Sequence, residues 1–281
     1  CLRLPLKKSS QPVLVETWPN IPGNNRLSGL NLLVVEDNAI NQLVLEDMLR
    51  AEGAKVSLAH NGQHALTAVA HADKPFDAIL MDIQMPVMDG LEATRHIKQQ
   101  HPQQLIVGQT AHALTEEIEK CQDAGMAATI TKPIDLEILV STLLKLLARS
   151  AAPKQPEAGS TESLAPHATL IDWQGFAQRY NNRTQFIEHL AELFVQVHAN
   201  DGEKLREFCA RKDMAAIERI AHDLKGTAGN IFANPVQELA KKTMESARQN
   251  SDATFTQAMA LASHMDRLIL ELKQGHPPFG H

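Results

Sequence analysis

The sequence predicts two folds in one chain: an α/β domain built on a doubly wound parallel sheet, then an all-α domain that forms an antiparallel helical bundle. Three observations predict this. From Leu30, short apolar runs alternate with helical patterns, as in a parallel sheet with helices on both faces. From Leu170, apolar residues recur only at helical spacing, as in a bundle. Between the two parts, residues 149–168 are small, polar and interrupted by proline, which predicts a flexible linker.

The length of 281 residues agrees with two domains. We expect a linker at residues 1–29, the α/β domain at 30–148, the second linker at 149–168, the bundle at 169–274 and a frayed tail at 275–281. Because the sequence has no initiator Met, we also expect it to be a piece of a longer protein.

The predicted strands of the α/β domain are residues 32–35, 54–58, 76–82, 105–110 and 128–131. Each is followed by a helical pattern, and the helices are predicted to end near Gly53, Pro102 and Gly125. Asp135 is predicted to cap the last of them. In the bundle, we expect a short helix capped by Asp172 and four further helices around residues 186–197, 217–231, 235–244 and 255–272.

The composition excludes several classes of function. A net charge of −6 and an aromatic content of 4% give no basic or aromatic surface for nucleic acid. Three distant cysteines predict neither a disulfide framework nor a zinc site and are typical of a reducing, cytoplasmic compartment. Because no apolar run is long enough to span a membrane, we expect no direct membrane contact by this part. A longer parent can still be anchored in the inner membrane.

Polar residues stand at the carboxyl ends of the predicted strands: Glu36 and Asp37, Asp82, Thr110, and Lys132. These ends meet at one edge of a parallel sheet, where such folds bind ligands. Three carboxylates without soft ligands suit Mg²⁺, which also neutralises an incoming phosphoryl group. Asp82 would be the nucleophile, while Lys132 and Thr110 would contact phosphate oxygens. Each residue alone could be an ordinary cap; their joint placement favours a phosphoryl site.

These residues resemble the motifs of the receiver domain of two-component signalling proteins. The matching residues are Glu36-Asp37-Asn38, Met81-Asp82-Ile83-Gln84-Met85-Pro86, Asp89-Gly90, Thr110-Ala111 and Lys132-Pro133. The resemblance implies a flavodoxin-like sheet of order 2-1-3-4-5 and phosphorylation of Asp82. It also implies a Mg²⁺ held by Asp37, Asp82 and the Gln84 carbonyl, with Glu36 nearby. Receivers usually carry an aromatic residue or His three positions before the lysine; because this chain has Thr129, an aromatic switch is not carried over.

A second site is predicted around His222. His222, Lys225, Gly226 and Gly229 lie on one side of a predicted helix, beside its apolar face. Two helical glycines cost about 1 kcal/mol each relative to Ala, so we expect them to leave a bare docking face for a partner's site. The imidazole would be a nucleophile, and Lys225 would stabilise a phosphate on it. Eight other histidines are interpreted as solvated helical residues: His60, His64, His71, His96, His101, His112, His189 and His198.

Residues 221–229, Ala-His-Asp-Leu-Lys-Gly-Thr-Ala-Gly, resemble the signature of histidine phosphotransfer (HPt) domains. One departure is Phe232, which stands where the family often has Gly, so we expect a bulkier end of the docking face. Residues 2–6 resemble the closing strand of a histidine-kinase ATPase domain. A receiver followed by an HPt domain resembles the C-terminal part of a bacterial hybrid sensor histidine kinase.

The resemblance implies a phosphorelay: Asp82 accepts phosphate from an upstream kinase histidine, in the same parent protein or in trans, and passes it to His222. His222 then donates it to a separate response regulator receiver. No Gly-rich ATP loop is present, so we expect no autophosphorylation from ATP. Alternatives left open are a non-catalytic docking module that regulates another kinase and a reverse phosphate drain. An aspartyl phosphatase is disfavoured because it would need a second acid at Gln84.

Overall fold

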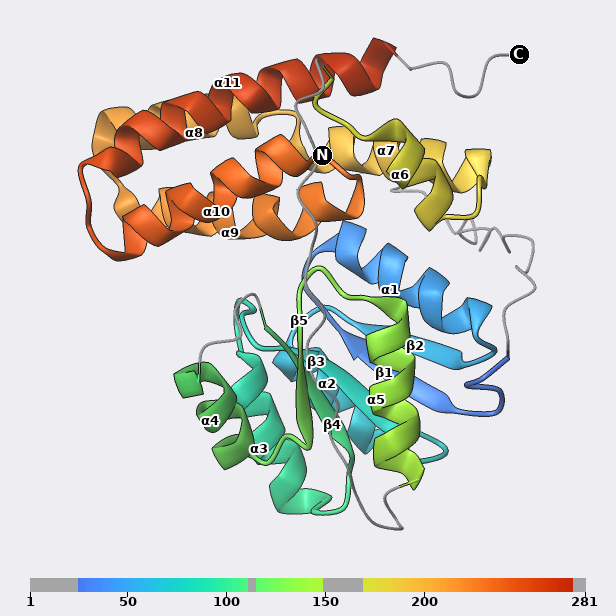
Figure 1. Ribbon diagram of the computed structural model, residues 1–281. Helices are drawn as coiled ribbons and strands as arrows, with labels where there is room; N and C mark the ends of the chain where they lie inside the picture. Colours follow the sequence, from blue (N-terminus) through green and yellow to red (C-terminus); the bar gives the residue numbers. More distant parts are fainter. Residues whose placement is uncertain (1–24, 111–114, 149–168, 275–281) are drawn as a thin grey trace, which may run out of the picture.

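The computed structural model describes residues 25–110, 115–148 and 169–274. Its first part is a five-stranded parallel sheet of order β2-β1-β3-β4-β5 (Figure 1). This order confirms the predicted flavodoxin-like sheet. The strands are β1 (Asn31–Val35), β2 (Lys55–Ala59), β3 (Ala78–Asp82), β4 (Ile106–Thr110) and β5 (Ala128–Thr131).

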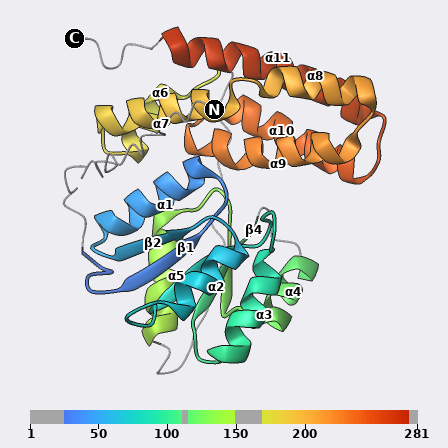
Figure 2. The ribbon, with the colours of Figure 1, turned by 180° about the vertical axis from the view of Figure 1, so that it is seen from behind.

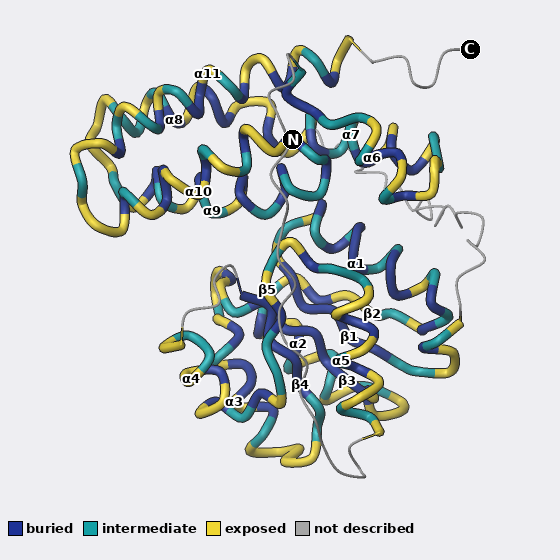
Figure 3. Tube along the Cα trace, in the orientation of Figure 1, coloured by how far each residue is buried: buried dark blue, intermediate teal, exposed yellow. Residues whose placement is uncertain are grey.

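Helices cover both faces of the sheet, as expected for a doubly wound fold. One face carries α1 (Ala39–Ala51) and α5 (Leu136–Ala148), whose side chains pack on Leu32, Val34 and Leu80. The other face carries α2 (Gly62–Ala70), α3 (Gly90–Gln100) and α4 (Thr115–Ala124), which pack on Leu33, Ile79 and Met81. Consecutive residues of the central strands therefore enter opposite cores, so β1, β3 and β4 are buried on both sides (Figure 3).

Side chains and glycines fix the helix ends on the site edge of the sheet. The Asn38 side chain accepts from the first backbone N–H groups of α1, and Asp89 caps α3 in the same way. At Gly90, a Cβ atom would lie 2.0 Å from the carbonyl oxygen of Asp82. The loop after β3 can therefore return this close to the strand end only through glycine.

Residues 169–274 fold into helices, and this confirms the predicted bundle. The helices are α6 (Trp173–Arg179), α7 (Thr184–His198), α8 (Asp201–Arg211), α9 (Met214–Asn230), α10 (Asn234–Arg248) and α11 (Ala253–Gln274). The sequence analysis did not predict α8, because among its 11 residues few besides Leu205 and Phe208 are apolar. Its contact with α11 nevertheless makes it part of the bundle (Figure 2).

The two parts of the chain share one apolar interface. Ile40, Val44 and Met48, one turn apart along α1, are buried in the same cluster as the core of the bundle, and α1 contacts α7 and α9. Figures 1 and 2 both show α1 lying between the sheet and the bundle. Thus α1 has two buried faces: Leu45 and Leu49 pack on the sheet, and the other face packs on the bundle.

Two sequence expectations differ from the structure. Leu27, assigned to the first linker, is fully buried in the α/β core and its N–H donates to the Glu52 carbonyl. His198, interpreted as solvated, is 2% exposed, and its Nδ1 lies 2.7 Å from an Asp201 oxygen. The predictions for residues 2–6, for the linker at 149–168 and for the tail lie outside the described residues. Among the described helices, none combines the length and apolarity that a membrane span requires.

Candidate active site

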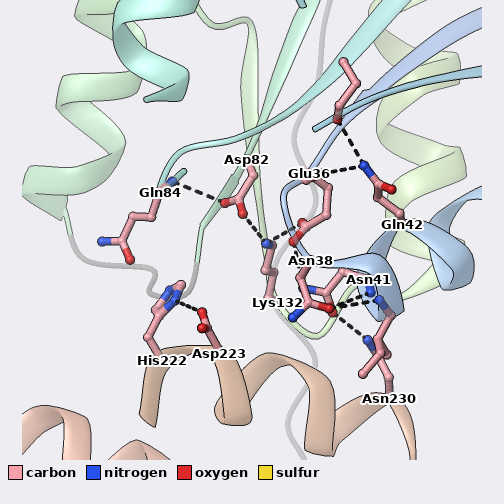
Figure 4. Close-up of polar contacts among 12 residues, drawn as sticks. Glu36, Asn38, Asn41, Gln42, Asp82, Gln84, Lys132, His222, Asp223 and Asn230 are labelled. Atoms are coloured by element: carbon pink, nitrogen blue, oxygen red, sulfur yellow. Dashed lines mark hydrogen bonds and ion pairs between the residues drawn. The ribbon is translucent and has the colours of Figure 1, made fainter. Parts of the chain in front are cut away.

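The structure brings the predicted acidic residues together at one edge of the sheet. Glu36 and Asp37 follow β1, Asp82 ends β3 and Lys132 follows β5. One carboxylate oxygen from each of the three acids lies within 4.8 Å of the others. The Lys132 ammonium donates to Glu36 Oε2 at 2.6 Å and to Asp82 Oδ2 at 2.7 Å. Figure 4 shows Lys132 in contact with Glu36 and Asp82.

Burial sets the electrostatics of this cluster. Burial raises the pKa of Glu36 to about 7 although Lys132 opposes the shift. Burial and the carboxylates of Glu36 and Asp223 raise the pKa of Asp37 to about 6. Burial alone would lower the pKa of Lys132, but Glu36 and Asp82 together hold it above its ordinary value. Lys132 is therefore charged and is the local counterion of the acids.

The donor set fits a hard divalent cation. It consists of carboxylate oxygens alone, the ligand type that Mg²⁺ prefers. Burial raises the pKa values of Glu36 and Asp37, and repulsion from neighbouring carboxylates adds to both shifts; a bound cation offsets that repulsion. Gln84 lies on the adjoining loop, where its backbone N–H donates to Asp82 Oδ1 at 3.3 Å. The Gln84 carbonyl, the fourth expected Mg²⁺ ligand, thus lies two residues after Asp82 in the sequence.

Thr110 is a predicted site residue whose hydroxyl bonds to α4 and not to the acidic cluster. It ends β4 directly after Gln109, the register partner of Asp82. Its hydroxyl, however, donates to Glu117 Oε2 in the first turn of α4 at 2.8 Å. To contact a phosphoryl group on Asp82, this hydroxyl has to exchange its Glu117 partner for a phosphate oxygen.

His222 of α9 faces the acidic cluster across the interface between the two parts of the chain. A pocket is lined by Asp37, Asp82 and Lys132 on one side and by His222 and Lys225 on the other. Figure 4 shows His222 and Asp223 projecting from α9 toward Asp82 and Gln84. The two predicted sites, 140 positions apart in the sequence, therefore form one pocket.

The imidazole and ammonium of α9 have defined electrostatic neighbours. His222 Nδ1 lies 3.6 Å from Asp223 Oδ1, a charge contact that is too long for a hydrogen bond. Lys225 is 8% exposed, and burial, reinforced by Lys241, lowers its pKa. The His222 ring therefore has a carboxylate beside Nδ1 and a buried cation one helical turn away.

The two glycines of α9 have different surroundings. A Cβ on Gly226 would meet only the Asn41 side chain of α1, at 3.6 and 3.9 Å, so Gly226 lies on the face toward the α/β part. A Cβ on Gly229 would instead meet Gln237 of α10 at 2.5 Å. Gly229 thus lies where α9 and α10 pack inside the bundle, which differs from the docking role expected for it.

Phe232 also differs from the expectation of a bulkier docking face. Its ring stacks on Phe176 of α6, with centroids 6.3 Å apart and planes inclined by 27°. It therefore packs into the bundle. Its φ of +57° explains why glycine suits this position, since a left-handed backbone strains a residue with a Cβ.

Several residues of this interface were missed by the sequence analysis. Asn41 of α1 donates to Glu36 Oε1 and accepts from Asn230 of α9, both at 2.9 Å. Arg183, at the start of α7, pairs with Asp47 of α1. Spacing offered a signal for Asn230 only, because it continues the i, i+4 row that begins with His222 and Gly226. Nothing in the sequence links the remaining partners.

Family comparisons agree with both halves of this site. The model of the response regulator receiver domain matches residues 32–144, and the model of the Hpt domain matches residues 189–274. The receiver domain of a sensor histidine kinase from Pseudomonas aeruginosa PAO1, solved with a magnesium ion in its active-site cleft, is 38% identical. It covers 43% of this chain and 99% of its own, with a TM-score of 0.40.

Alignments with two similar proteins extend over both matched domains of this chain. The sensor protein TorS of Escherichia coli K12 is 29% identical over 85% of this chain and 24% of its own length. The sensor histidine kinase GacS of Pseudomonas protegens is 31% identical over 85% of this chain and 26% of its own. The chain thus spans about a quarter of these relatives. It belongs to the phosphorelay proteins of two-component signalling, in which a receiver domain is joined to an Hpt domain as in the C-terminal part of hybrid sensor histidine kinases.

Proposed function

We propose that Asp82 accepts a phosphoryl group from a kinase histidine and passes it to His222 of the same chain. His222 then gives it to the receiver domain of a separate response regulator. The observation that carries this proposal is the single pocket lined by Asp82 and His222. A docked arrangement that faces donor and acceptor across one interface provides the proximity that phosphoryl transfer needs.

In the first step, an Asp82 oxygen attacks the phosphorus of the kinase phosphohistidine. The new bond is an acyl phosphate P–O bond, and the P–N bond breaks, so imidazole leaves. Lys132, which contacts the Asp82 carboxylate at 2.7 Å, supplies a positive charge to the phosphoryl oxygens. Thr110 would donate its hydroxyl hydrogen to a second oxygen after it leaves Glu117.

In the second step, His222 Nε2 attacks phosphorus, and the P–O bond to Asp82 breaks, which returns a carboxylate. Asp223, 3.6 Å from Nδ1, favours the proton on Nδ1 and leaves the Nε2 lone pair for attack. The ring becomes a cation on phosphorylation, and the Asp223 carboxylate balances that charge. Lys225, buried one turn along α9, is placed to neutralise the transferred phosphate.

Glu36, Asp37, Asp82 and the Gln84 carbonyl would hold Mg²⁺, of which the first three already converge. When bound, the ion supplies positive charge to the phosphoryl oxygens and offsets the repulsion among the acids. Asp37 keeps more contact with solvent than the other two acids, since Glu36 and Asp82 are buried and bonded to Lys132. Asp37 is thus the ligand most open to an arriving ion.

The relay is tested by labelling the full chain with acetyl phosphate and Mg²⁺, followed by alkali or acid treatment. Aspartyl phosphate is lost in alkali, whereas phosphohistidine survives alkali and is lost in acid. We expect alkali-stable label that disappears in both His222→Gln and Asp82→Asn. Alkali-stable label in Asp82→Asn would contradict the relay. Label confined to Asp82 would leave an Hpt domain loaded in trans, and no label at all would favour a docking module without catalysis.

A further inference from the structure

A chain of hydrogen bonds crosses the interface and enters the acid cluster. Asn230, the last residue of α9, donates its side-chain Nδ2–H to Asn41 Oδ1 of α1 at 2.9 Å. Asn41 in turn donates its Nδ2–H to Glu36 Oε1 at 2.9 Å. Figure 4 shows the three side chains in this order. An Hpt residue is thereby connected to a receiver acid that it does not touch.

The direction of these hydrogen bonds follows from the chemistry of Glu36, the last residue in the row. In its ionised form, the Glu36 carboxylate only accepts hydrogen bonds, so the amide nitrogen of Asn41 faces it. The Asn41 carbonyl oxygen then faces the Hpt domain and requires a donor, which Asn230 supplies. The interface therefore selects a donor at position 230 and disfavours an acceptor there.

The other oxygen of Glu36 continues the path to the phosphoacceptor. Glu36 Oε2 accepts from Lys132 at 2.6 Å, and the same ammonium donates to Asp82 Oδ2 at 2.7 Å. Because Glu36 and Lys132 are both nearly inaccessible to solvent, water cannot readily replace a lost partner. Rotation of the Asn41 amide would therefore change how Glu36 holds Lys132 against Asp82.

The geometry of α9 makes room for this contact. Gly226 lies one turn before Asn230, and the nearest atoms to its missing side chain belong to Asn41. The Tyr180 hydroxyl donates to the Asn230 carbonyl oxygen at 3.0 Å and holds the end of α9 in place. Gly226 thus admits the Asn41 side chain, and Tyr180 fixes the residue that binds it.

We propose that Asn230 is a positioning residue for transfer: through Asn41 it fixes Glu36 and Lys132 in the orientation that presents Asp82 to His222. This inference rests on the relay proposed above. Docking of the Hpt domain thereby completes the acid site of the receiver, because Asn230 arrives with the domain that carries the acceptor histidine.

The test measures the rate of appearance of alkali-stable label on His222 in the full chain, with quenching at short times after addition of acetyl phosphate and Mg²⁺. Asn230→Asp keeps the shape of the side chain and removes its donor. We expect it to slow transfer more than Asn230→Ala does, because its carboxylate would face the Asn41 carbonyl. For Asn230→Ala we expect a loss of about three- to tenfold, the range of one hydrogen bond.

A double-mutant cycle tests whether Asn41 and Asn230 act through one path. Asn41→Ala combined with Asn230→Ala should lose little more than either single variant, because both break one path. The matched control is Arg183→Ala, which removes an interface contact that does not involve Asn41, so its effect should multiply with that of Asn41→Ala. Equal coupling in both cycles, or a wild-type transfer rate in Asn230→Asp, would overturn the inference.

An NMR measurement tests the connection from Asn230 through Asn41 to Glu36 without relying on phosphoryl transfer. In the ¹⁵N-labelled, metal-free full chain, the side-chain amide signals of Asn41 should shift in Asn230→Asp as strongly as in Glu36→Gln. Unchanged Asn41 signals in Asn230→Asp would overturn the inference. Failure of the relay is recognised separately, by a wild-type chain that labels Asp82 and never His222.

Discussion

Arg183 and Asp47 form a two-pronged ion pair that joins the start of α7 to the middle of α1. Arg183 Nη1 donates to Asp47 Oδ1 at 2.9 Å, and Nη2 donates to Oδ2. The Arg183 guanidinium also lies 4.5 Å from the centre of the Phe186 ring, and its Nε–H donates to the Tyr180 carbonyl. The arginine is therefore held in place by its own domain before the receiver binds.

We expect Arg183→Ala to weaken docking of the two domains by about 2 kcal/mol or more, since it leaves the Asp47 carboxylate without its partner in a largely buried interface. Small-angle scattering should show a larger radius of gyration, and transfer to His222 should slow. Glu46→Gln is the matched control, because this neighbour on α1 pairs, among the described residues, only with Arg50 of the same helix. An Arg183→Ala protein as compact as the wild type would contradict the prediction.

The acid cluster predicts opposite pH effects on the metal-free and the Mg²⁺-bound protein. The pKa values of Glu36, about 7, and Asp37, about 6, exceed the value of about 4 of unfolded carboxyls. Between about pH 4 and pH 7, these two carboxyls thus bind more protons in the metal-free folded protein than in the unfolded chain. Their contribution to the free energy of unfolding therefore falls as the pH rises through this window.

Mg²⁺ binds the ionised acids, so its stabilising effect should grow over the same window. We expect the Tm difference between samples with Mg²⁺ and with EDTA to widen from about pH 5 to about pH 8. In Glu36→Gln, the free energy of unfolding of the metal-free protein should fall less steeply with rising pH. A Tm difference that does not depend on pH would show that these acids are not the ligands.

Side chains of increasing size at Gly226 test whether this residue lies in the docking face. Gly226→Ala should preserve transfer, because its Cβ would make only ordinary contacts with Asn41, and should stabilise the Hpt domain by up to about 1 kcal/mol. Gly226→Leu should block docking, because a branched side chain would occupy the place of Asn41. Thermal unfolding and the rate of His222 labelling measure the two effects; equal transfer in both variants would remove Gly226 from the interface.

Gly90→Ala should unfold the loop after β3 or destabilise the receiver by several kcal/mol, because the added methyl would lie 2.0 Å from a backbone oxygen of Asp82. Labelling of Asp82 should fall as the receiver loses stability. Gly226→Ala controls for the general effect of replacing a glycine in a helix. If Gly90→Ala had a wild-type Tm, the close return of this loop to the strand would be wrong.

Val87 is expected to destabilise the receiver slightly. It has a φ of +73°, which a β-branched residue rarely adopts, and its side chain is 86% exposed. Because it has little packing to lose, Val87→Asn should raise the free energy of unfolding by about 1 kcal/mol. Denaturant unfolding measures this. A loss of stability would show that the Val87 side chain contributes contacts that outweigh the backbone strain.

The sequence predicts those features that depend on local pattern. Buried strands read as apolar runs, and acids at strand ends such as Asp82 share an edge because parallel strands all point the same way. Asp135 and Asp172 cap their helices as predicted, since a cap is a contact between near neighbours. In the same way, the pattern of α9 places His222 beside the apolar face of its helix.

Features that depend on contacts distant in the sequence were not predictable. Asn41 and Asn230 are 189 positions apart, and no periodicity relates them. The helix α8 was missed because its polar composition carries little helical pattern, although packing on α11 stabilises it. Phe232 was expected to enlarge the docking face because it stands where the Hpt family often has Gly, but at its left-handed backbone the ring packs into the bundle.

The apolar face of α1 has a consequence for timing. Ile40, Val44 and Met48 are buried against the same bundle that presents His222, so one bundle accommodates one receiver at a time. In the proposed relay, a phosphoryl group on His222 would therefore be shielded from any second receiver until α1 departs. For the relay to work, the receiver of the same chain would have to stay docked for longer than one transfer takes. It would also have to leave before the phosphohistidine hydrolyses.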